Sequence, residues 1–510
     1  MTYMKTKIAW LKTKPIIVYF TCIPILCILV LLSHRKQITT VDTSTYYHKE
    51  KASWPVQIND ASINSLQSLY TPSMFIPDAL KTNHFYPLTA VIVRTNKDLG
   101  VYHIVQHLYK YPFIKEIIIY NLLPSQSIPS NIFDRPDQWL IHKVKTDVIN
   151  ATSEEDHDGM LSLFTTCGLA SFSHCYIQSD RTLNPFMDTL YTHFMKYPTL
   201  LHVNTRSQDY KTHKRWQLYH QDEDMDLHFG YANIQHGAIL PRKMAIQFTN
   251  QLSMQEMVHQ QRRMADVFFS FWTNSYPWLL SNPLPLVDKQ PLPYHQMLNA
   301  VRRFEKALKN KTPYFNQGNS IEPALHERDV KTSCGNDKCL FVTNIDPFPL
   351  STEYRPEQNL TNSSLGSSLK WEEEFDLDLP SSEYLVHRGY HAAVDGNSGT
   401  CWNTYLVPKA GNYFGLDIVG TIRVSRLLMY TRQPLKDPGQ AFRVIVQLQD
   451  NNWNDCQLTM DEKQTIPRRT VYQMNCPDRM KPIKAIRIFF NHDHDTPFDL
   501  CGLGLDNFIV

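Results

Sequence analysis

Polar side chains follow the short apolar runs of this chain, at the points where strands are expected to end. The residues in these positions are Arg94, Thr95, Asn96, Asn121, Ser179, Asp180 and Arg181. Because ligands of an open parallel sheet bind at the carboxyl ends of its strands, these side chains are expected to converge on one binding site. Arginine binds phosphate oxygens and a carboxylate binds a hard divalent cation, so these residue types fit an anionic ligand or its metal ion.

The segments that carry these residues alternate between strand and helix patterns. Apolar runs rich in β-branched residues predict strands at 88–93, 114–121, 174–180 and 200–204. Helical patterns lie between them, at 99–111, 159–170 and 183–198. Strand–helix–strand units of this size imply a mainly parallel sheet covered by helices, which is a Rossmann-like α/β fold. We expect this domain to span 85–304.

The pattern changes after the α/β region. Residues 305–380 contain many prolines and a serine-rich stretch, and are expected to form a linker or an elaborated connection. β-Rich runs then follow at 413–419, 423–431, 441–449 and 485–490, without a long helical period between them. They predict an all-β sandwich over residues 381–510.

The amino-terminal region predicts a single membrane anchor. Residues 15–33 are nineteen residues without a charge. At about 1.5 Å per residue they just span a hydrocarbon core of ~30 Å. The tail at 1–14 carries lysines and no acidic residue, which predicts a cytoplasmic amino terminus, a stem at 34–84 and a lumenal remainder. A cleaved signal peptide is the alternative, although the apolar run is longer than a usual signal sequence.

Cysteines and glycosylation sequons agree with an oxidising compartment. Of the 10 cysteines, eight lie beyond the predicted anchor: Cys167, Cys175, Cys334, Cys339, Cys401, Cys456, Cys476 and Cys501. This even number predicts disulfide bonds, and Cys334 with Cys339 could close a small loop. Sequons for N-glycosylation occur at Asn150, Asn310, Asn359 and Asn362.

Composition excludes several classes of protein. The chain has 51 Lys and Arg against 49 Asp and Glu, a net charge of +2, which argues against a nucleic-acid-binding protein. A hydrophobic content of 42% excludes global disorder. Only 17 of the 510 residues are glycine, and no glycine-rich phosphate loop is present. Phosphate recognition would therefore come from local groups such as Arg94 and Arg181, or from a bound metal ion.

The α/β region resembles the GT-A nucleotide-sugar glycosyltransferases, and its similarity is nearest to exostosin-type enzymes. The matching segments are LTAVIVRTN (88–96), IKEIIIYN (114–121), CYIQSDRTLNPFMDTLY (175–191) and MADVFFSFW (264–272). The resemblance implies a nucleotide-sugar donor held by the polar residues at the strand ends. It also implies an acidic cluster that binds Mn²⁺ or Mg²⁺ and so stabilises the departing nucleotide diphosphate.

The segment that matches this acidic cluster departs from the family pattern. It reads Gln178–Ser179–Asp180–Arg181, so Asp180 is its only carboxylate. Three interpretations stay open: a weak metal site at Asp180, a metal-independent site in which Arg181 takes part of the diphosphate charge, or loss of activity. A surface turn in which Asp180 and Arg181 cap the next helix is the structural alternative.

The resemblance also implies a role for Asp266, at the start of the aromatic-rich segment 264–272. Its carboxylate would deprotonate the acceptor sugar hydroxyl. The alternative is an aspartate at a helix amino terminus, stabilised by the helix dipole.

The carboxyl-terminal region resembles discoidin-type, galactose-binding-like β-sandwiches. The matching segments are AVDGNSGTCWNT (393–404), YFGLDIVGTIRVSRLLMYTR (413–432) and FDLCGLGLDNF (498–508). Weak candidates for glycan binding are Trp402, Asp395 and Asn397, with a core position as the alternative for Trp402. The resemblance implies that Cys401 pairs with Cys501, and that Cys456 and Cys476 bracket a hairpin.

Together these features predict a type II Golgi membrane glycosyltransferase, of the hexosyl- or N-acetylhexosaminyltransferase class. It would move a sugar from a nucleotide sugar to a glycan or glycoprotein acceptor. The alternatives are an inactive, transferase-like glycan-binding protein and a membrane-anchored adhesion protein at the cell surface.

Overall fold

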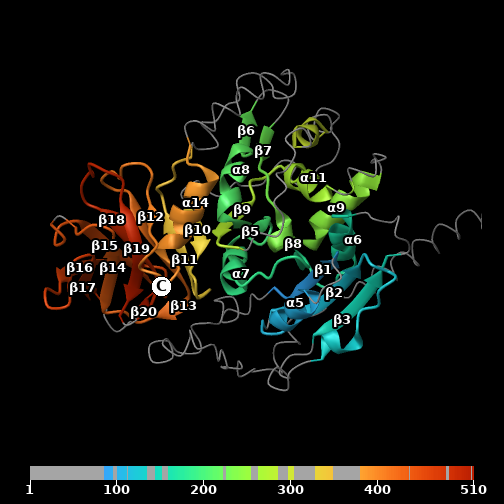
Figure 1. Cartoon of the computed structure of the whole chain (residues 1–510), viewed down its shortest axis with the longest axis horizontal. Coiled ribbons are helices and arrows are strands. Elements are labelled where there is room, and N and C mark those ends of the chain that lie inside the picture. The colour runs from blue at the N-terminus through green and yellow to red at the C-terminus, as the bar shows by residue number, and fades with distance from the viewer. Residues whose placement is uncertain are drawn as a thin grey trace, which may run out of the picture. The chain divides into compact units, whose positions relative to one another are not determined.

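The computed structural model describes most of the chain from residue 86 onward (Figure 1). The described residues are 86–95, 100–111, 113–134, 144–151, 159–221, 226–253, 262, 264–284, 297–303, 328–348, 379–435, 437–477, 482–506 and 508–509. The predicted anchor and stem lie outside them, as do Asn96, Asn310, Asn359 and Asn362. Within the described ranges, no helix has the length and apolar character that crossing a membrane requires.

A seven-stranded sheet forms the first part of the fold. Its order is β3 (Lys145–Asn150), β2 (Ile114–Asn121), β1 (Leu88–Arg94), β4 (His174–Ser179), β8 (Ala238–Pro241), β5 (His202–Arg206) and β9 (Trp278–Asn282). The pairs β2–β3, β1–β2, β1–β4 and β5–β9 are parallel, which confirms the α/β prediction. Strand β8 is antiparallel to both β4 and β5, so the sheet is mixed but mainly parallel, as the sequence predicted.

Helices lie between these strands along the chain, because their apolar residues recur with helical spacing. They are α5 (Gly100–Leu108), α6 (Leu161–Leu169), α7 (Met187–Lys196), α8 (Tyr210–Arg215), α9 (Arg242–Ser253) and α11 (Ala265–Trp272). In α7, for example, Met187, Leu190, Tyr191 and Phe194 are all fully buried. Every residue of β1 is buried as well, as expected for a strand covered on both faces.

Short elements complete the α/β part. They are the hairpin β6 (Leu218–Gln221) and β7 (Asp226–Phe229), and the 3₁₀ turns η2 (Ser130–Phe133), η4 (Ser207–Asp209) and η5 (Ile234–His236). The turn η5 precedes β8 directly, and Gly237 joins the two with a φ of 111°. Only glycine adopts this backbone conformation without strain.

Antiparallel strands form the second part of the fold, which confirms the all-β prediction. They are β10 (Val330–Ser333), β11 (Cys339–Thr343), β12 (Trp402–Asn403), β13 (Tyr413–Ile422), β14 (Arg426–Thr431), β15 (Phe442–Leu448), β16 (Trp453–Met460), β17 (Arg469–Asn475), β18 (Ile483–Phe490), β19 (Asp499–Leu505) and β20 (Phe508–Ile509). A short helix, α14 (Ser382–Arg388), and a 3₁₀ turn, η7 (Tyr390–Ala393), precede β12. The strands enclose one apolar core that includes Phe414, Val444 and Leu503.

Strands β10 and β11 lie within the segment 305–380, for which the sequence predicted a linker or an elaborated connection. They pair with each other, and β11 pairs with β13, so they extend the β part. The two strands contain no proline, although prolines are frequent in the surrounding region. Because prolines indicate loops, the two short runs of β-branched and aromatic residues were not predicted as strands.

The eight described cysteines form disulfides, as the even count predicted. The pairs are Cys167–Cys175, Cys334–Cys339, Cys401–Cys501 and Cys456–Cys476. The third bond joins residues 100 positions apart in the sequence, from the position before β12 to β19.

Candidate functional site

The point where the chain changes direction in the sheet lies between β1 and β4. From β1 the chain moves outward through β2 and β3, and then returns to place β4 on the other side of β1. Open α/β sheets bind ligands in the crevice at the carboxyl ends of such a pair of strands. The register aligns Val93 with Ser179 and Arg94 with Asn121, so these strand ends meet at this edge.

Asp180 and Thr95 join the two strand ends directly. The Asp180 carboxylate accepts the backbone N–H of Thr95 at 2.9 Å and its hydroxyl at 2.7 Å. The side chain of Arg181 is exposed, and its Nε lies 3.4 Å from the same hydroxyl. Helix α7 begins only at Met187, so Asp180 does not cap it, and the helix-capping alternative does not apply.

The amino terminus of α5 lies close to this junction. A Cβ atom on Gly100 would be 2.6 Å from the backbone oxygen of Asp180, so only glycine allows this close approach. Helix amino termini favour anions because their first N–H groups have no partner within the helix. The edge therefore combines the Arg181 side chain with the positive end of a helix.

Arg94 and Asn121 shape the loop after β2. Both donate to the backbone oxygen of Gln126, at 3.1 Å and 3.0 Å respectively. Asn121 also donates to the side-chain oxygen of Asn150, the sequon residue at the exposed end of β3, at 2.9 Å. Asn121 is fully buried, so these protein contacts account for its position.

Asp266 is a buried carboxylate in the first turn of α11. It is 4% exposed and accepts a hydrogen bond from the side chain of Gln235 at 3.0 Å. The backbone oxygen of Gln235 in turn accepts from the Ser179 hydroxyl at 3.3 Å. Burial raises the pKa of Asp266, although the hydrogen bond from Gln235 opposes the change. A raised pKa makes this carboxylate a better proton acceptor near neutral pH.

Several polar groups near Asp266 were not singled out from the sequence. Tyr231 is buried without a partner for its hydroxyl, and Asp266 and Asp209 add to the effect of burial in raising its pKa. His236 is buried, and burial together with nearby Arg206 lowers its pKa to about 4. Arg206 pairs with Asp209 through two hydrogen bonds, at 2.6 and 3.0 Å. Arg206 ends β5 and Asp209 follows it, whereas Tyr231 and His236 precede β8.

The donor atoms at Asp180 do not match a protein cage for a divalent cation. Both carboxylate oxygens already accept hydrogen bonds from Thr95, the Ser179 hydroxyl contacts Gln235, and Arg181 brings positive charge. Within the described ranges, no group of three or more His, Cys, Asp or Glu residues could hold a metal ion. Proteins usually hold Mg²⁺ with one or two carboxylates, and waters and substrate phosphates complete its ligands. The single carboxylate here is already engaged by Thr95, so the residues of this segment do not form a metal site by themselves.

The glycan-binding candidates of the β part divide into core and surface. Trp402 is 2% exposed, and its ring packs against Phe341 and Tyr390, which is the core position left open by the sequence. Asp395 accepts hydrogen bonds from the Asn397 backbone and the Thr400 hydroxyl, so it stabilises a turn. Asn397 is exposed in that turn.

Comparisons with known proteins reach only the level of a coarse fold. Neither a protein-family model nor a curated protein sequence matches this chain. One similar solved structure is a mannosyltransferase from Pyrobaculum calidifontis in complex with GDP-Man and Mn²⁺, with 12% identity, a TM-score of 0.28, and coverage of 68% of this chain and 92% of that one. Another is the 4-diphosphocytidyl-2C-methyl-D-erythritol synthase from Anaerococcus prevotii, with 12% identity, a TM-score of 0.26, and coverage of 43% and 96%.

A third solved structure is similar over a shorter segment. It is CpGH89CBM32-5 from Clostridium perfringens, in complex with GalNAc-β-1,3-galactose, with 14% identity and a TM-score of 0.18. The match covers 22% of this chain and 81% of that one. Likenesses at these TM-scores carry no functional argument, so the function is argued from the residues of this chain.

Proposed function

We propose that this chain is a glycosyltransferase that binds a nucleotide sugar at the carboxyl ends of β1 and β4. The observation that carries the proposal is the junction of Asp180 with Thr95 at the point where the sheet changes direction, beside Arg181 and the amino terminus of α5. The resemblance of the segments at 88–96 and 175–191 to GT-A enzymes supports the same assignment.

The chemistry assigned to the site needs a charge partner and a base. Arg181, with the helix end, neutralises the diphosphate as the bond from the sugar anomeric carbon to the phosphate oxygen breaks. The acceptor hydroxyl forms the new bond to that carbon and gives its proton to the Asp266 carboxylate. No step in this proposal passes through a metal ion, because the donor atoms at Asp180 do not complete a metal site.

The proposal includes the setting of the enzyme and the role of the β part. The uncharged segment at 15–33, the lysines before it and the four disulfides support a type II protein of the Golgi lumen. We assign the β part to the recognition of a glycan or glycoprotein acceptor.

A second candidate is a protein that binds nucleotide sugars without turnover. The observation that favours it is the single carboxylate in the Gln178–Arg181 segment, where the resemblance implies an acidic cluster. The two candidates share a binding site and differ only in whether the donor is consumed.

Thermal unfolding with nucleotide diphosphates tests the binding site. UDP, GDP and CDP are added with and without Mn²⁺, and we expect one of them to raise the Tm with increasing concentration. The substitution Arg181→Ala should abolish the shift, whereas Arg443→Ala, on an exposed residue of β15, should keep it. If no nucleotide shifts the Tm, both candidates fail. If one does but no nucleotide sugar is consumed with any glycan acceptor tested, the second candidate holds.

A further inference from the structure

A chain of buried hydrogen-bonded side chains crosses the α/β sheet. Asn282, on β9, donates to Asn204 on β5 at 2.7 Å. Asn204 donates to Asn184 at 2.8 Å, and Asn184 donates to the Tyr176 hydroxyl at 3.2 Å. Tyr176 then donates to the side-chain oxygen of Gln178. All five side chains are at most 1% exposed, so water cannot replace these partners.

The chain of hydrogen bonds ends on the loop that carries Asp180 and Arg181. The Gln178 amide donates to the backbone oxygen of Thr182. Asn184 also accepts the backbone N–H of Phe186 at 3.0 Å, just before α7. The side chains of Gln178 and Asn184 therefore hold both ends of the segment 182–186.

All the hydrogen bonds in this row of side chains point in the same direction, from Asn282 on β9 toward the loop that carries Asp180 and Arg181. Each asparagine accepts on its oxygen from one neighbour and donates with its nitrogen to the next. Hydrogen bonds aligned in this way polarise one another in a low-dielectric interior. An aspartate in place of an asparagine keeps the shape but cannot donate, so a single substitution breaks the chain at a chosen point.

Gly237 provides the space that this row of hydrogen-bonded side chains needs. A Cβ atom at this position would lie 2.6 Å from the Tyr176 hydroxyl and 2.7 Å from the Asn184 nitrogen. The same residue offers its backbone oxygen to the N–H of Asn204 at 3.0 Å. The glycine that precedes β8 thus leaves room for the side chains of Tyr176, on β4, and Asn184, just before α7.

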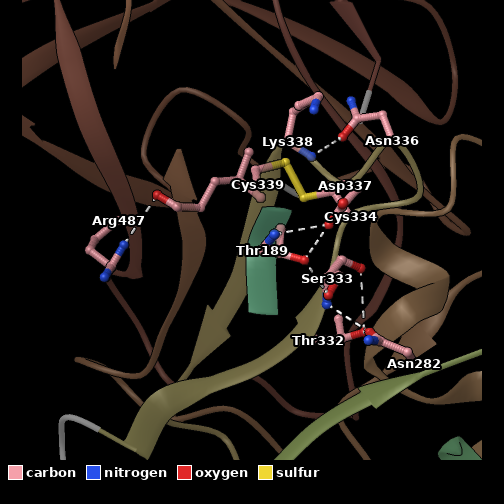
Figure 2. The surroundings of a disulfide bond; sticks show 11 residues. Thr189, Asn282, Thr332, Ser333, Cys334, Asn336, Asp337, Lys338, Cys339 and Arg487 are labelled. Atoms are coloured by element: carbon pink, nitrogen blue, oxygen red, sulfur yellow. Dashed lines mark hydrogen bonds between the residues drawn. A yellow bond between two sulfur atoms is a disulfide. The ribbon is translucent and has the colours of Figure 1, made fainter. Parts of the chain in front are cut away.

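Asn282, at the other end of this row of hydrogen-bonded side chains, contacts the β part. The oxygen of Asn282 accepts the Ser333 backbone N–H at 2.9 Å and the Thr332 hydroxyl at 3.0 Å, both on β10 (Figure 2). The Cys334–Cys339 disulfide follows directly and closes a short loop. Asp337, in this loop, accepts the backbone N–H groups of Asp188 at 2.8 Å and Thr189 at 3.0 Å, in the first turn of α7.

We propose that this amide chain positions the Asp180–Arg181 loop from the β part, with Asn282, Asn204, Asn184 and Gln178 as positioning residues. The structural claim stands by itself. Its consequence for ligand affinity rests on the proposed nucleotide-sugar site. The two claims are tested by separate measurements.

Hydrogen exchange of the full chain without nucleotide tests the structural claim. In Asn282→Asp, the backbone N–H groups of Asp180 and Phe186 should exchange about tenfold faster, the factor expected from one lost buried hydrogen bond. The matched control is Val203→Ala, which removes fully buried methyl groups beside Asn204 and leaves every amide in place. Equal exchange at these two positions in both variants would overturn the proposal.

Two further variants keep the test decisive if Asn282→Asp folds poorly. Thr332→Val removes the hydroxyl that lies 2.7 Å from the backbone oxygen of Ser281 and 3.0 Å from the side-chain oxygen of Asn282, and it should accelerate the same two N–H groups to a smaller extent. Gln178→Glu removes the last donor, and combining it with Asn282→Asp should add little to either single effect, because both break one chain. Additive effects would mean that the two residues act independently, which contradicts the proposal.

Nucleotide affinity tests the functional consequence. If UDP or GDP binds the wild-type chain, Asn282→Asp should weaken its Kd about tenfold while Val203→Ala leaves it unchanged. An unchanged Kd in Asn282→Asp would overturn the link to the ligand site. If none of UDP, GDP and CDP binds the wild-type chain, the proposed function fails, and the exchange measurement still decides the role of the hydrogen-bonded amides.

Discussion

The α/β part and the β part bury different kinds of side chains. Within the described residues of the α/β part, buried carboxylates and amides include Glu116, Asn121, Gln178, Asn204 and Asp266. Among the described residues from 379 onward, the buried polar side chains are one histidine and four threonines: His391, Thr404, Thr421, Thr431 and Thr470. From residue 379 onward the β part therefore relies on apolar packing and disulfides. The α/β part and the β10–β11 segment instead hold buried groups that need specific partners, Lys331, Asp337 and Lys338 among them.

This difference indicates where the geometry of the molecule is most constrained. A buried polar group is stable only when its partners are in place, so it restricts the structure around it. In the α/β part these groups surround the ends of β1, β4 and β5, where the candidate site lies. Strand β10 of the β part connects to these groups, because the Ser333 backbone N–H donates to Asn282.

Asp266→Asn should give the largest effect on activity. If Asp266 is the base, kcat should fall about 10²- to 10⁴-fold, with little change in nucleotide affinity. Because burial raises the pKa of Asp266, the wild-type kcat should fall on the acid side at a higher pH than an ordinary aspartate would cause. Steady-state kinetics measures both.

The control for this variant is Asp455→Asn, on the exposed surface of β16 in the β part. It should leave kcat unchanged. Equal turnover in Asp266→Asn and wild type would remove Asp266 from the mechanism.

The disulfides of the two parts should differ in their contribution to stability. Replacing Cys401 and Cys501 by serine opens a loop of 100 residues and should lower the free energy of unfolding by about 4 to 5 kcal/mol. The same change at Cys167 and Cys175, only 8 residues apart, should lower it by about 2 to 3 kcal/mol. Urea unfolding of both double variants measures the difference, and a reversed order would contradict the loop-entropy explanation.

Trp402→Ala should destabilise the β part by about 3 to 5 kcal/mol, because it removes a buried ring from the apolar core. The matched control is Trp453→Ala, on β16, whose side chain is 42% exposed. That variant should change the free energy of unfolding by less than about 1 kcal/mol. Urea unfolding of the two variants decides between a core and a surface role for Trp402; similar losses would argue against the core position.

Acid should destabilise the α/β part before the β part. Burial lowers the pKa of His174 to about 4 and that of His202 to about 3, and lowers the pKa of His193 well below its usual value. Such a histidine binds a proton more readily when the chain is unfolded, so stability is lost as the pH falls below about 6.5. Between about pH 6.5 and its own lowered pKa, each of these histidines reduces the free energy of unfolding by about 1.4 kcal/mol per pH unit.

Replacing one of these histidines tests the assignment. His202→Asn should reduce the loss of unfolding free energy between pH 6.5 and 5.5 by about 1 kcal/mol. The control is His387→Asn, on an exposed residue of α14, which should keep the wild-type pH dependence. An unaltered pH dependence in His202→Asn would show that this imidazole is not the group that resists protonation.

Much of the fold could be predicted from local patterns. The helical spacing of Met187, Leu190, Tyr191 and Phe194 and the apolar run at Leu88–Arg94 each satisfy a local rule. The antiparallel β8 could not be predicted, because its four residues carry no signal of direction and its partners are more than 30 positions away. Strands β10 and β11 were missed for a different reason, since they are only four and five residues long and lie in a proline-rich region.

The sequence by itself determined which residues end the strands, and hence that Arg94, Asn121, Ser179 and Asp180 share one edge of the sheet. Only the tertiary structure decided what each of them contacts. Asp266 meets Gln235 across 31 positions, and Asn282 meets Asn204 across 78. The physical reason is that strand and helix patterns follow from burial within a few neighbouring residues. An amide or carboxylate is instead satisfied by any partner that folding brings within about 3 Å, and no local pattern encodes that partner.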